Sequence, residues 1–375
     1  MSHALAIALL RKAANELRQI HRARHYMEWR DDNAGDLGVS LLATEPFAAL
    51  GSLSIPAGSS KPTEAAHRIG GWAIDQLVAR VKPEAMLTRL AEELARNSTT
   101  FVDVHVIANA TIDAPCLLSA ALEVAAAPPM LPWPVSDRAR AGLAEIRQPF
   151  TLTLAYIPSE RAGQMGPGIQ APSALKRAEA LPLVRYACLL ASNGPIEFTP
   201  LRVDRDHADL FTPPRFHETV PNTLAGPHAH MIVASDLKAM HAGLGKFAAQ
   251  EPLFRAIERL GRARRAQDPV DQALELGIAA EIAMTHGDQG GPEITYRLST
   301  RLAWLMGKSA EDREAIFKDA KTLYTARSKA VHEGRLLPKH RPDLIAGDRL
   351  VTRALRALVE RGAFPDWTKL TMGAG

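Results

Sequence analysis

Arg327 and His332 are residue types that together can act on a phosphate ester. An arginine stabilises negative charge on a phosphate, and a histidine serves as a general acid or a general base. The same Arg-x4-His spacing occurs at two other places, Arg202/His207 and Arg335/His340. Spacing alone therefore identifies no site. Five residues turn an ideal helix by about 500°, or about 140° net. The two side chains converge on one phosphate only if they flank a groove or if a second subunit contributes the facing pair.

A helix predicted over residues 309–333 carries both residues. Ser309 can cap its start, Asp312 stands in the capping-box position, and Gly334 marks its end. The apolar stripe of this helix is Ile316, Phe317, Ala320, Leu323, Tyr324 and Val331. Arg327 occupies the position that should continue the stripe between Tyr324 and Val331.

A charged residue in a packing face is expected at functional sites. An arginine in such a place can also form a buried structural ion pair, here with Glu281 or Glu275. From the residues alone, both interpretations of Arg327 stay open.

The elements around this pair are helical. From about residue 236 the strand patterns end and five helical segments follow, separated by Gly, Pro or Asp. Their predicted limits are 236–265, 270–286, 293–306, 309–333 and 345–362. We therefore predict a helical bundle over residues 236–370, large enough to have its own core.

Residues 1–235 have mixed patterns and predict an α+β region of unknown function. Helices are expected at 1–27, 64–80 and 83–96. The alternation of Val102, Val104 and Val106 with polar residues predicts a half-buried strand, as does the alternation over residues 150–156. Residues 128–134 and 163–172 are expected to be loops. The predicted fold class is thus α+β, with a mixed N-terminal region followed by an all-α bundle.

The composition is that of a globular protein, with 46% hydrophobic and 23% charged residues. The apolar run at residues 4–10 is too short to span a bilayer, and no signal-peptide cleavage site follows it. The two cysteines, Cys116 and Cys188, are expected to be buried free thiols. These features predict a cytoplasmic protein without a membrane segment.

The basic excess lies in the C-terminal third. Residues 251–369 hold 21 Lys/Arg and 17 Asp/Glu, a balance of +4, which equals the net charge of the whole chain. This distribution is compatible with a polyanionic substrate of the predicted bundle.

The sequence around Arg327 resembles that of HEPN proteins, in particular the Apea-like branch, which typically has a Leu-Tyr pair, Arg-Ser and then Val-His-Gly. The corresponding residues are 323–334 (LYTARSKAVHEG), in which Glu333 separates the histidine from the glycine. Residues 294–307 (ITYRLSTRLAWLMG) and 355–367 (LRALVERGAFPDW) also match, in the same order. The resemblance covers about residues 250–370 and does not extend to residues 1–235.

The resemblance implies a metal-independent RNA endonuclease that acts as a homodimer, with an Arg/His pair from each subunit facing one cleft. Arg327 and His332 would be the catalytic pair in a transphosphorylation, with His332 as general acid or general base. Ser328 could orient His332 or donate to phosphate. Glu281 is the expected carboxylate that orients Arg327, with Glu275 as the alternative, and Tyr324 of the Leu-Tyr pair is counted among the supporting residues.

RNA contacts are expected from Arg301, Arg297 and Lys329, with a salt-bridged arginine as the alternative for Arg301. A second basic group on the first predicted helix of the bundle could follow RNA or be a solvated helix face. It consists of Arg255, Arg259, Arg262, Arg264 and Arg265.

Metal and cofactor motifs are weak, and neither a metal nor a cofactor is expected. A metal site in a Pro-rich segment is a minor alternative, formed by His207, His217, His228 and His230 with Asp204 and Asp206. His21 and His25 lack the glutamate of the zincin pattern, and residues 163–168 (GQMGPG) lack the Lys-Ser/Thr ending of a P-loop.

The leading hypothesis is an RNase that is restrained until a phage-derived or cellular trigger acts on the N-terminal region, in anti-phage defence or a toxin-like response. The alternative is a non-catalytic HEPN module for dimerisation or RNA binding. A metal-dependent enzyme built on the N-terminal histidines ranks third.

Overall fold

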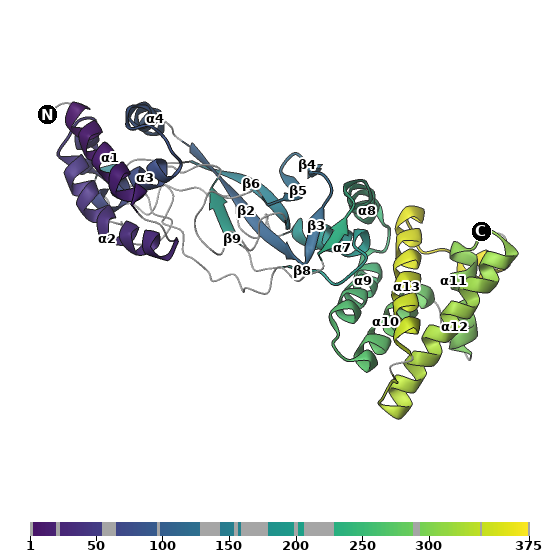
Figure 1. The fold of residues 1–375 in the computed structure, drawn as a ribbon. Coiled ribbons are helices and arrows are strands. Elements are labelled where there is room, and N and C mark those ends of the chain that lie inside the picture. The colour runs from purple at the N-terminus through teal and green to yellow at the C-terminus, as the bar shows by residue number, and fades with distance from the viewer. Residues whose placement is uncertain are drawn as a thin grey trace.

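The computed structural model describes residues 3–19, 23–54, 65–95, 98–127, 143–153, 157–158, 179–198, 202–205, 229–287, 293–337 and 340–373. It is an elongated molecule with the N-terminal helices at one end, a sheet in the middle and the C-terminal helices at the other end (Figure 1). The predicted α+β class with a helical C-terminal region is confirmed. None of the described helices combines the length and apolar character that crossing a bilayer requires.

The N-terminal end consists of α1 (His3–Arg18), α2 (Ala23–Leu42), a 3-10 helix η1 (Phe47–Ser52), α3 (Ala65–Val78) and α4 (Pro83–Ala95). The helices predicted at 64–80 and 83–96 are confirmed as α3 and α4. The single helix predicted over 1–27 is wrong. Helix α1 ends at Arg18, and a second helix, α2, begins at Ala23 and extends to Leu42. Helices α2 and α3 touch through glycine. A Cβ on Gly38 would lie 1.7 Å from the carbonyl oxygen of Ala66.

The central sheet is antiparallel, with the strand order β4-β5-β6-β2-β8 and with β9 also paired to β2. Its strands are β2 (Ser98–Ala108), β4 (Cys116–Ser119), β5 (Leu122–Ala126), β6 (Ala144–Thr153), β8 (Glu197–Phe198) and β9 (Arg202–Arg205). Two further pairs are antiparallel β1 (Leu53–Ser54) with β7 (Ile157–Pro158), and parallel β3 (Ala110–Ile112) with β10 (His230–Ile232).

Both predicted strands exist, as β2 and β6. The expectation that β2 is half-buried is wrong, since Asp103 and His105 on its polar face are each 3% exposed. Side chains on both faces of β2 are therefore covered, Val102, Val104 and Val106 on one and Asp103 and His105 on the other. Residues 154–156, the predicted loops at 128–134 and 163–172, and the P-loop candidate at 163–168 lie outside the described residues.

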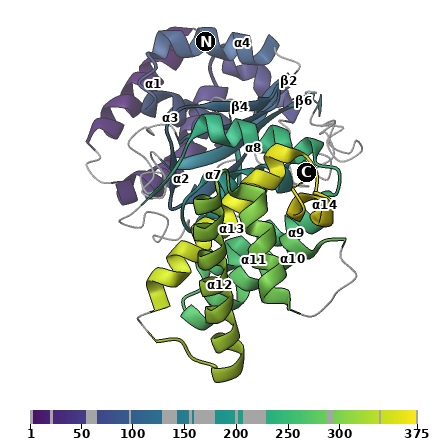
Figure 2. The same ribbon diagram turned by 90° about the vertical axis from the view of Figure 1, so that its right-hand side faces the viewer.

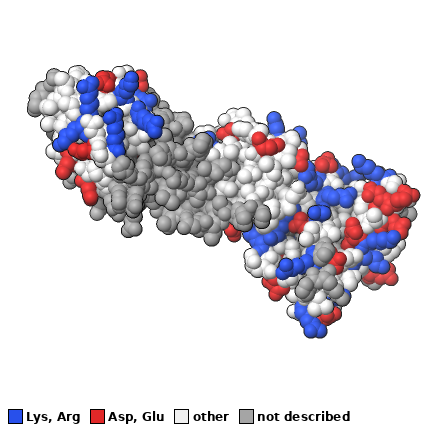
Figure 3. All heavy atoms as spheres, viewed as in Figure 1, with Lys and Arg blue, Asp and Glu red and all other residues white. Residues whose placement is uncertain are grey.

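The C-terminal end is helical. Its elements are α7 (Leu181–Ala191), α8 (Ala234–Lys246), α9 (Gln250–Arg265), α10 (Pro269–Thr285), α11 (Ile294–Met306), α12 (Ala310–Glu333), α13 (Arg341–Arg361) and α14 (Trp367–Thr371). Figure 2 places α9 to α13 together, below the sheet in that view. Basic and acidic side chains are interspersed over the described helices at both ends of the molecule (Figure 3).

The helix predicted over 236–265 is wrong, because the chain breaks between α8 and α9. Helix α8 ends before Phe247, because this residue has extended backbone angles. Its side chain is buried, with 3% exposed. Pro252 lies in the first turn of α9, where a missing N–H costs no helical hydrogen bond. The other four predicted helices are confirmed as α10 to α13, although α13 begins four residues earlier, at Arg341.

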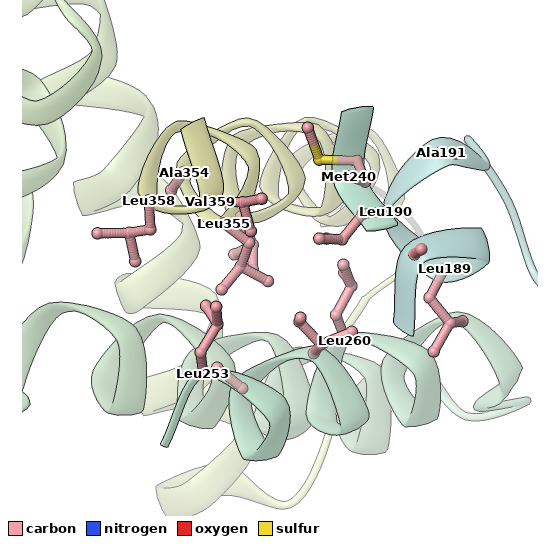
Figure 4. Close-up of a cluster of buried hydrophobic side chains, with 14 of the residues drawn as sticks. Leu189, Leu190, Ala191, Met240, Leu253, Leu260, Ala354, Leu355, Leu358 and Val359 are labelled. Carbon is pink, nitrogen blue, oxygen red and sulfur yellow. The ribbon is translucent and has the colours of Figure 1, made fainter. Parts of the chain in front are cut away.

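One hydrophobic cluster joins the sheet to the helices. It extends from Ile107 in β2 and Ile146 in β6 to Leu370 in α14. Side chains of α7, α8, α9 and α13 meet in its centre, among them Leu190, Met240, Leu260 and Leu355 (Figure 4). The domain boundary at 235/236 stays a prediction. Apolar contacts continue across it through α7, which the sequence patterns did not predict.

Candidate functional site

Helix α12 has the ends that its sequence predicts. The hydroxyl of Ser309 accepts a hydrogen bond from the backbone N–H of Asp312 at 3.1 Å. The carboxylate of Asp312 accepts from the backbone N–H of Lys308 at 3.0 Å, one residue before the usual capping-box donor. At the other end Gly334 has φ +62° and donates to the carbonyl of Ala330. These caps fix the length of the helix that carries Arg327 and His332.

The buried face of α12 differs from the predicted stripe at its C-terminal end. Val331 is 49% exposed, and small residues are buried there in its place. The buried positions are Ile316, Ala320, Leu323, Ala326 and Ala330. Arg327 therefore lies at the edge of the packing face, with 27% of its side chain exposed.

Arg327 crosses α10 at a glycine. A Cβ on Gly277 would lie 2.5 Å from Cγ of Arg327 and 3.1 Å from its Cβ. Beyond the crossing, Nη2 of Arg327 lies 3.3 Å from Oε1 of Glu281, one helical turn after Gly277. The guanidinium also lies 5.4 Å from the centre of the Tyr324 ring. The structure thus brings together Arg327, Glu281 and Tyr324.

Glu281, rather than Glu275, is the partner of Arg327. Glu275 binds Arg259, whose Nη1 lies 3.1 Å from both carboxylate oxygens. The alternative pairing of Arg327 with Glu275 is therefore wrong.

The side chains around Glu281 are partly shielded from water. Burial raises the pKa of the Tyr324 hydroxyl, and the nearby Glu281 carboxylate raises it further. Tyr324 therefore stays protonated at neutral pH and can donate a hydrogen bond.

Two arginines of the bundle differ in how far their donors are used. Arg264, with 2% of its side chain exposed, makes five hydrogen bonds. Their acceptors are two oxygens of Asp348, the hydroxyl of Thr352, and the carbonyls of Leu189 and Ser192. Arg327 has one ion pair, and its buried Nε has no hydrogen-bond partner within the described part of the chain. An arginine has five N–H donors, so Arg264 is saturated and Arg327 is not.

His332 lies in the last turn of α12 and is exposed. Among the residues that the structure describes, its ring has no hydrogen bond or ion pair. Ser328 and Lys329 are half-buried and likewise have no such contact there. Within one subunit, the described contacts do not connect His332 with Arg327, Glu281 or Tyr324.

The residues expected to bind RNA have different surroundings. Arg301 donates to the carbonyl of Met284 at 2.7 Å and lies over the Trp367 ring. Arg297 is half-buried. The prediction that the five arginines of α9 form one basic surface is wrong. Arg264 is buried, and Arg259 is paired with Glu275.

The cysteine prediction is confirmed, since Cys116 and Cys188 are buried free thiols.

No group of three or more His, Cys, Asp or Glu residues suited to a metal occurs among the described residues. His207, His217, His228, Asp206 and His21 lie outside them, and the structure describes no side chain for Asp204 or His25. His230 is in β10, where its ring lies against Gly194.

Gly277 is the residue of this site that sequence reasoning missed. Its signal was a glycine inside the helix predicted over 270–286, since such a glycine often marks a close approach.

No family model, no curated protein and no solved structure matches this chain. The resemblance to HEPN proteins therefore rests on the residues quoted above.

Proposed function

We propose that the helical C-terminal region is a metal-independent RNA endonuclease of the HEPN type, with Arg327 and His332 as its catalytic pair. The observation that supports this most is the state of Arg327. It is held in place by Gly277 and Glu281, but its buried Nε has no hydrogen-bond partner among the residues that the structure describes. Arg264, which is buried, uses all five of its donors, whereas the partly exposed Arg327 keeps a donor that a phosphate could use.

The proposed reaction is a transphosphorylation. The 2′-oxygen of a ribose forms a bond to the adjacent phosphorus, and the bond from phosphorus to the 5′-oxygen breaks. The 2′-hydroxyl loses a proton and the 5′-oxygen gains one. The products are a 2′,3′-cyclic phosphate and a 5′-hydroxyl.

In this proposal His332 moves one of the two protons, as general base or general acid. Arg327 stabilises the negative charge on the phosphate oxygens, and Glu281 holds its guanidinium in position. A homodimer supplies a second His332 for the other proton, which accounts for the exposed position of this residue. Arg301, Arg297 and Lys329 are proposed RNA contacts. The cellular setting we propose is the cytoplasm, in a defence or toxin-like response triggered through the N-terminal region.

The test is cleavage of RNA by the purified full chain with EDTA present, and identification of the product ends. We expect 2′,3′-cyclic phosphates with the wild-type chain and none with His332→Ala. His286→Ala, which replaces another exposed histidine of the bundle, is the matched control and should keep the activity. Undiminished cleavage by both His332→Ala and Arg327→Ala would overturn the proposal.

A non-catalytic RNA-binding or dimerisation module is the second candidate. The ion pair between Arg327 and Glu281 supports it, because such a pair also serves to join α10 to α12. This candidate expects RNA binding or dimerisation without cleavage, and a loss of stability as the main effect of replacing Arg327.

A further inference from the structure

Helix α13 has a second charged feature, on a face that the proposed catalytic pair does not use. A groove of about 920 Å³ runs along this face. The α13 residues that line it recur in each successive turn of the helix: Ile345, Asp348, Arg349, Thr352, Arg353, Arg356, Ala357 and Glu360. At 1.5 Å per residue, this row is about 22 Å long.

The cations of this groove fall into two kinds. Arg264 and Arg356 are paired, with Asp348 and Asp236 respectively. Arg349 and Arg353 are exposed, line the groove and have no hydrogen bond or ion pair among the residues described. Lys308 at the rim adds a third side chain without such a contact there. Arg264 neutralises the Asp348 carboxylate, and Arg349, Arg353 and Lys308 outnumber the exposed Glu360, so the charge that the groove presents to a ligand is positive.

The spacing of the two free arginines is unfavourable unless an anion binds. Arg349 and Arg353 are four residues apart on one helix face, about 6 Å along the axis, and like charges at this spacing destabilise a helix. An anion placed between them removes the repulsion.

We infer that this α13 groove binds the phosphate backbone of a single RNA strand. Its length exceeds that of a mononucleotide, and its three free cations lie at different points along it. Leu305, Met306 and the 54% exposed side chain of Ile345 supply apolar surface for sugars and bases. None of the described residues that line the groove is aromatic, so we expect base stacking to contribute little and binding to depend weakly on sequence.

This inference deepens the proposed nuclease function and rests on it for the choice of RNA as the ligand. Its test does not depend on cleavage. The probe is a fluorescein-labelled single-stranded RNA with 2′-O-methyl groups, which has no 2′-hydroxyl to attack the phosphate. Its affinity for the full chain is measured by fluorescence anisotropy over a series of salt concentrations.

The groove variant is Arg349→Gln/Arg353→Gln. Each phosphate contact on a single strand contributes about 0.7 to the slope of log K against log salt concentration. We expect weaker binding and a slope reduced by about 1.4, which is two contacts. The charge-matched control is Arg361→Gln/Lys369→Gln, two exposed cations outside the groove, and it should keep the wild-type slope. Arg349→Lys/Arg353→Lys should restore the slope, since lysine also neutralises phosphate.

A groove variant with the wild-type slope would overturn the inference, as would an equal loss in the control pair. A wild-type chain that does not bind the probe would overturn it too. None of these outcomes touches the cleavage test of His332→Ala, so failure of the groove and failure of the nuclease proposal are distinguishable.

Discussion

Arg327 passes over α10 at Gly277, where a methyl group would lie 2.5 Å from the Cγ atom of the arginine. The crossing atoms are near the backbone of α12, so they cannot swing aside as the end of a long side chain could. Gly277 therefore determines where the guanidinium emerges, one turn before Glu281 on the same helix.

Gly277→Ala should destabilise the protein, although alanine is normally the better helix residue. The helix preference favours alanine by about 0.5–1 kcal/mol, whereas overpacking a tight contact costs about 1–3 kcal/mol. We expect a lower urea midpoint and, in the nuclease assay, reduced cleavage because Arg327 is displaced.

The matched control for this change is Gly35→Ala in α2, where a Cβ meets nothing within 4 Å. It should raise the urea midpoint. The double variant Gly277→Ala/Arg327→Ala should lose less stability than the two single effects predict, because shortening Arg327 removes the 2.5 Å contact and leaves only that with its Cβ at 3.1 Å. Additive effects of the two changes would contradict the crossing geometry.

Arg327→Ala and His332→Ala should differ in stability while both abolish cleavage. Removing Arg327 leaves the Glu281 carboxylate without its partner, with an expected cost of about 1–3 kcal/mol. His332 is exposed and has no contact within the described residues, so its replacement should change stability by less than about 0.5 kcal/mol. Thermal unfolding of both variants beside the cleavage assay checks this. A stable His332→Ala chain with full cleavage activity would show that His332 is not a catalytic residue.

Local signals explain what the sequence could predict of this site. The caps of α12 at Ser309 and Gly334 involve neighbours in the chain, so the pattern determined both ends. The choice of Glu281 came with the family resemblance, and the structure confirms the contact with Arg327.

What the sequence did not predict depends on packing between distant segments. Val331 belongs to the apolar stripe by its spacing along the helix, yet 49% of it is exposed. Helix α12 packs instead through Ala326 and Ala330 against Ala273 of α10 and Leu344 of α13, so small side chains are the buried ones at this end of α12. A close contact of the same kind joins α2 to α3, where Gly38 lies against Ala66.

Arg264 should be the most sensitive charged residue of the bundle. It ties the end of α7 to α13 through the carbonyls of Leu189 and Ser192 and the side chain of Asp348. Arg264→Ala leaves a partly buried carboxylate without its partner, which costs about 3–5 kcal/mol for buried pairs. The exposed neighbour Arg265→Ala is the control and should change stability by less than about 0.5 kcal/mol. Equal denaturation midpoints for the two variants would contradict this role of Arg264.

His241 in α8 should make the protein less stable in mild acid. Burial lowers the pKa of its imidazole below the usual 6.5, because the charged form loses hydration. The unfolded chain then binds this proton more readily than the folded chain. The stability that His241 contributes is therefore complete above pH about 6.5 and is lost as the pH falls through the folded-state pKa.

His241→Gln removes this titration. The difference in unfolding free energy between wild type and variant should shift in favour of the variant as the pH falls from neutral to mildly acidic values. Urea denaturation at a series of pH values measures it. Parallel stability curves for the two chains across that range would show that His241 is not desolvated in the folded protein, and that the face of α8 on which it lies is open to water.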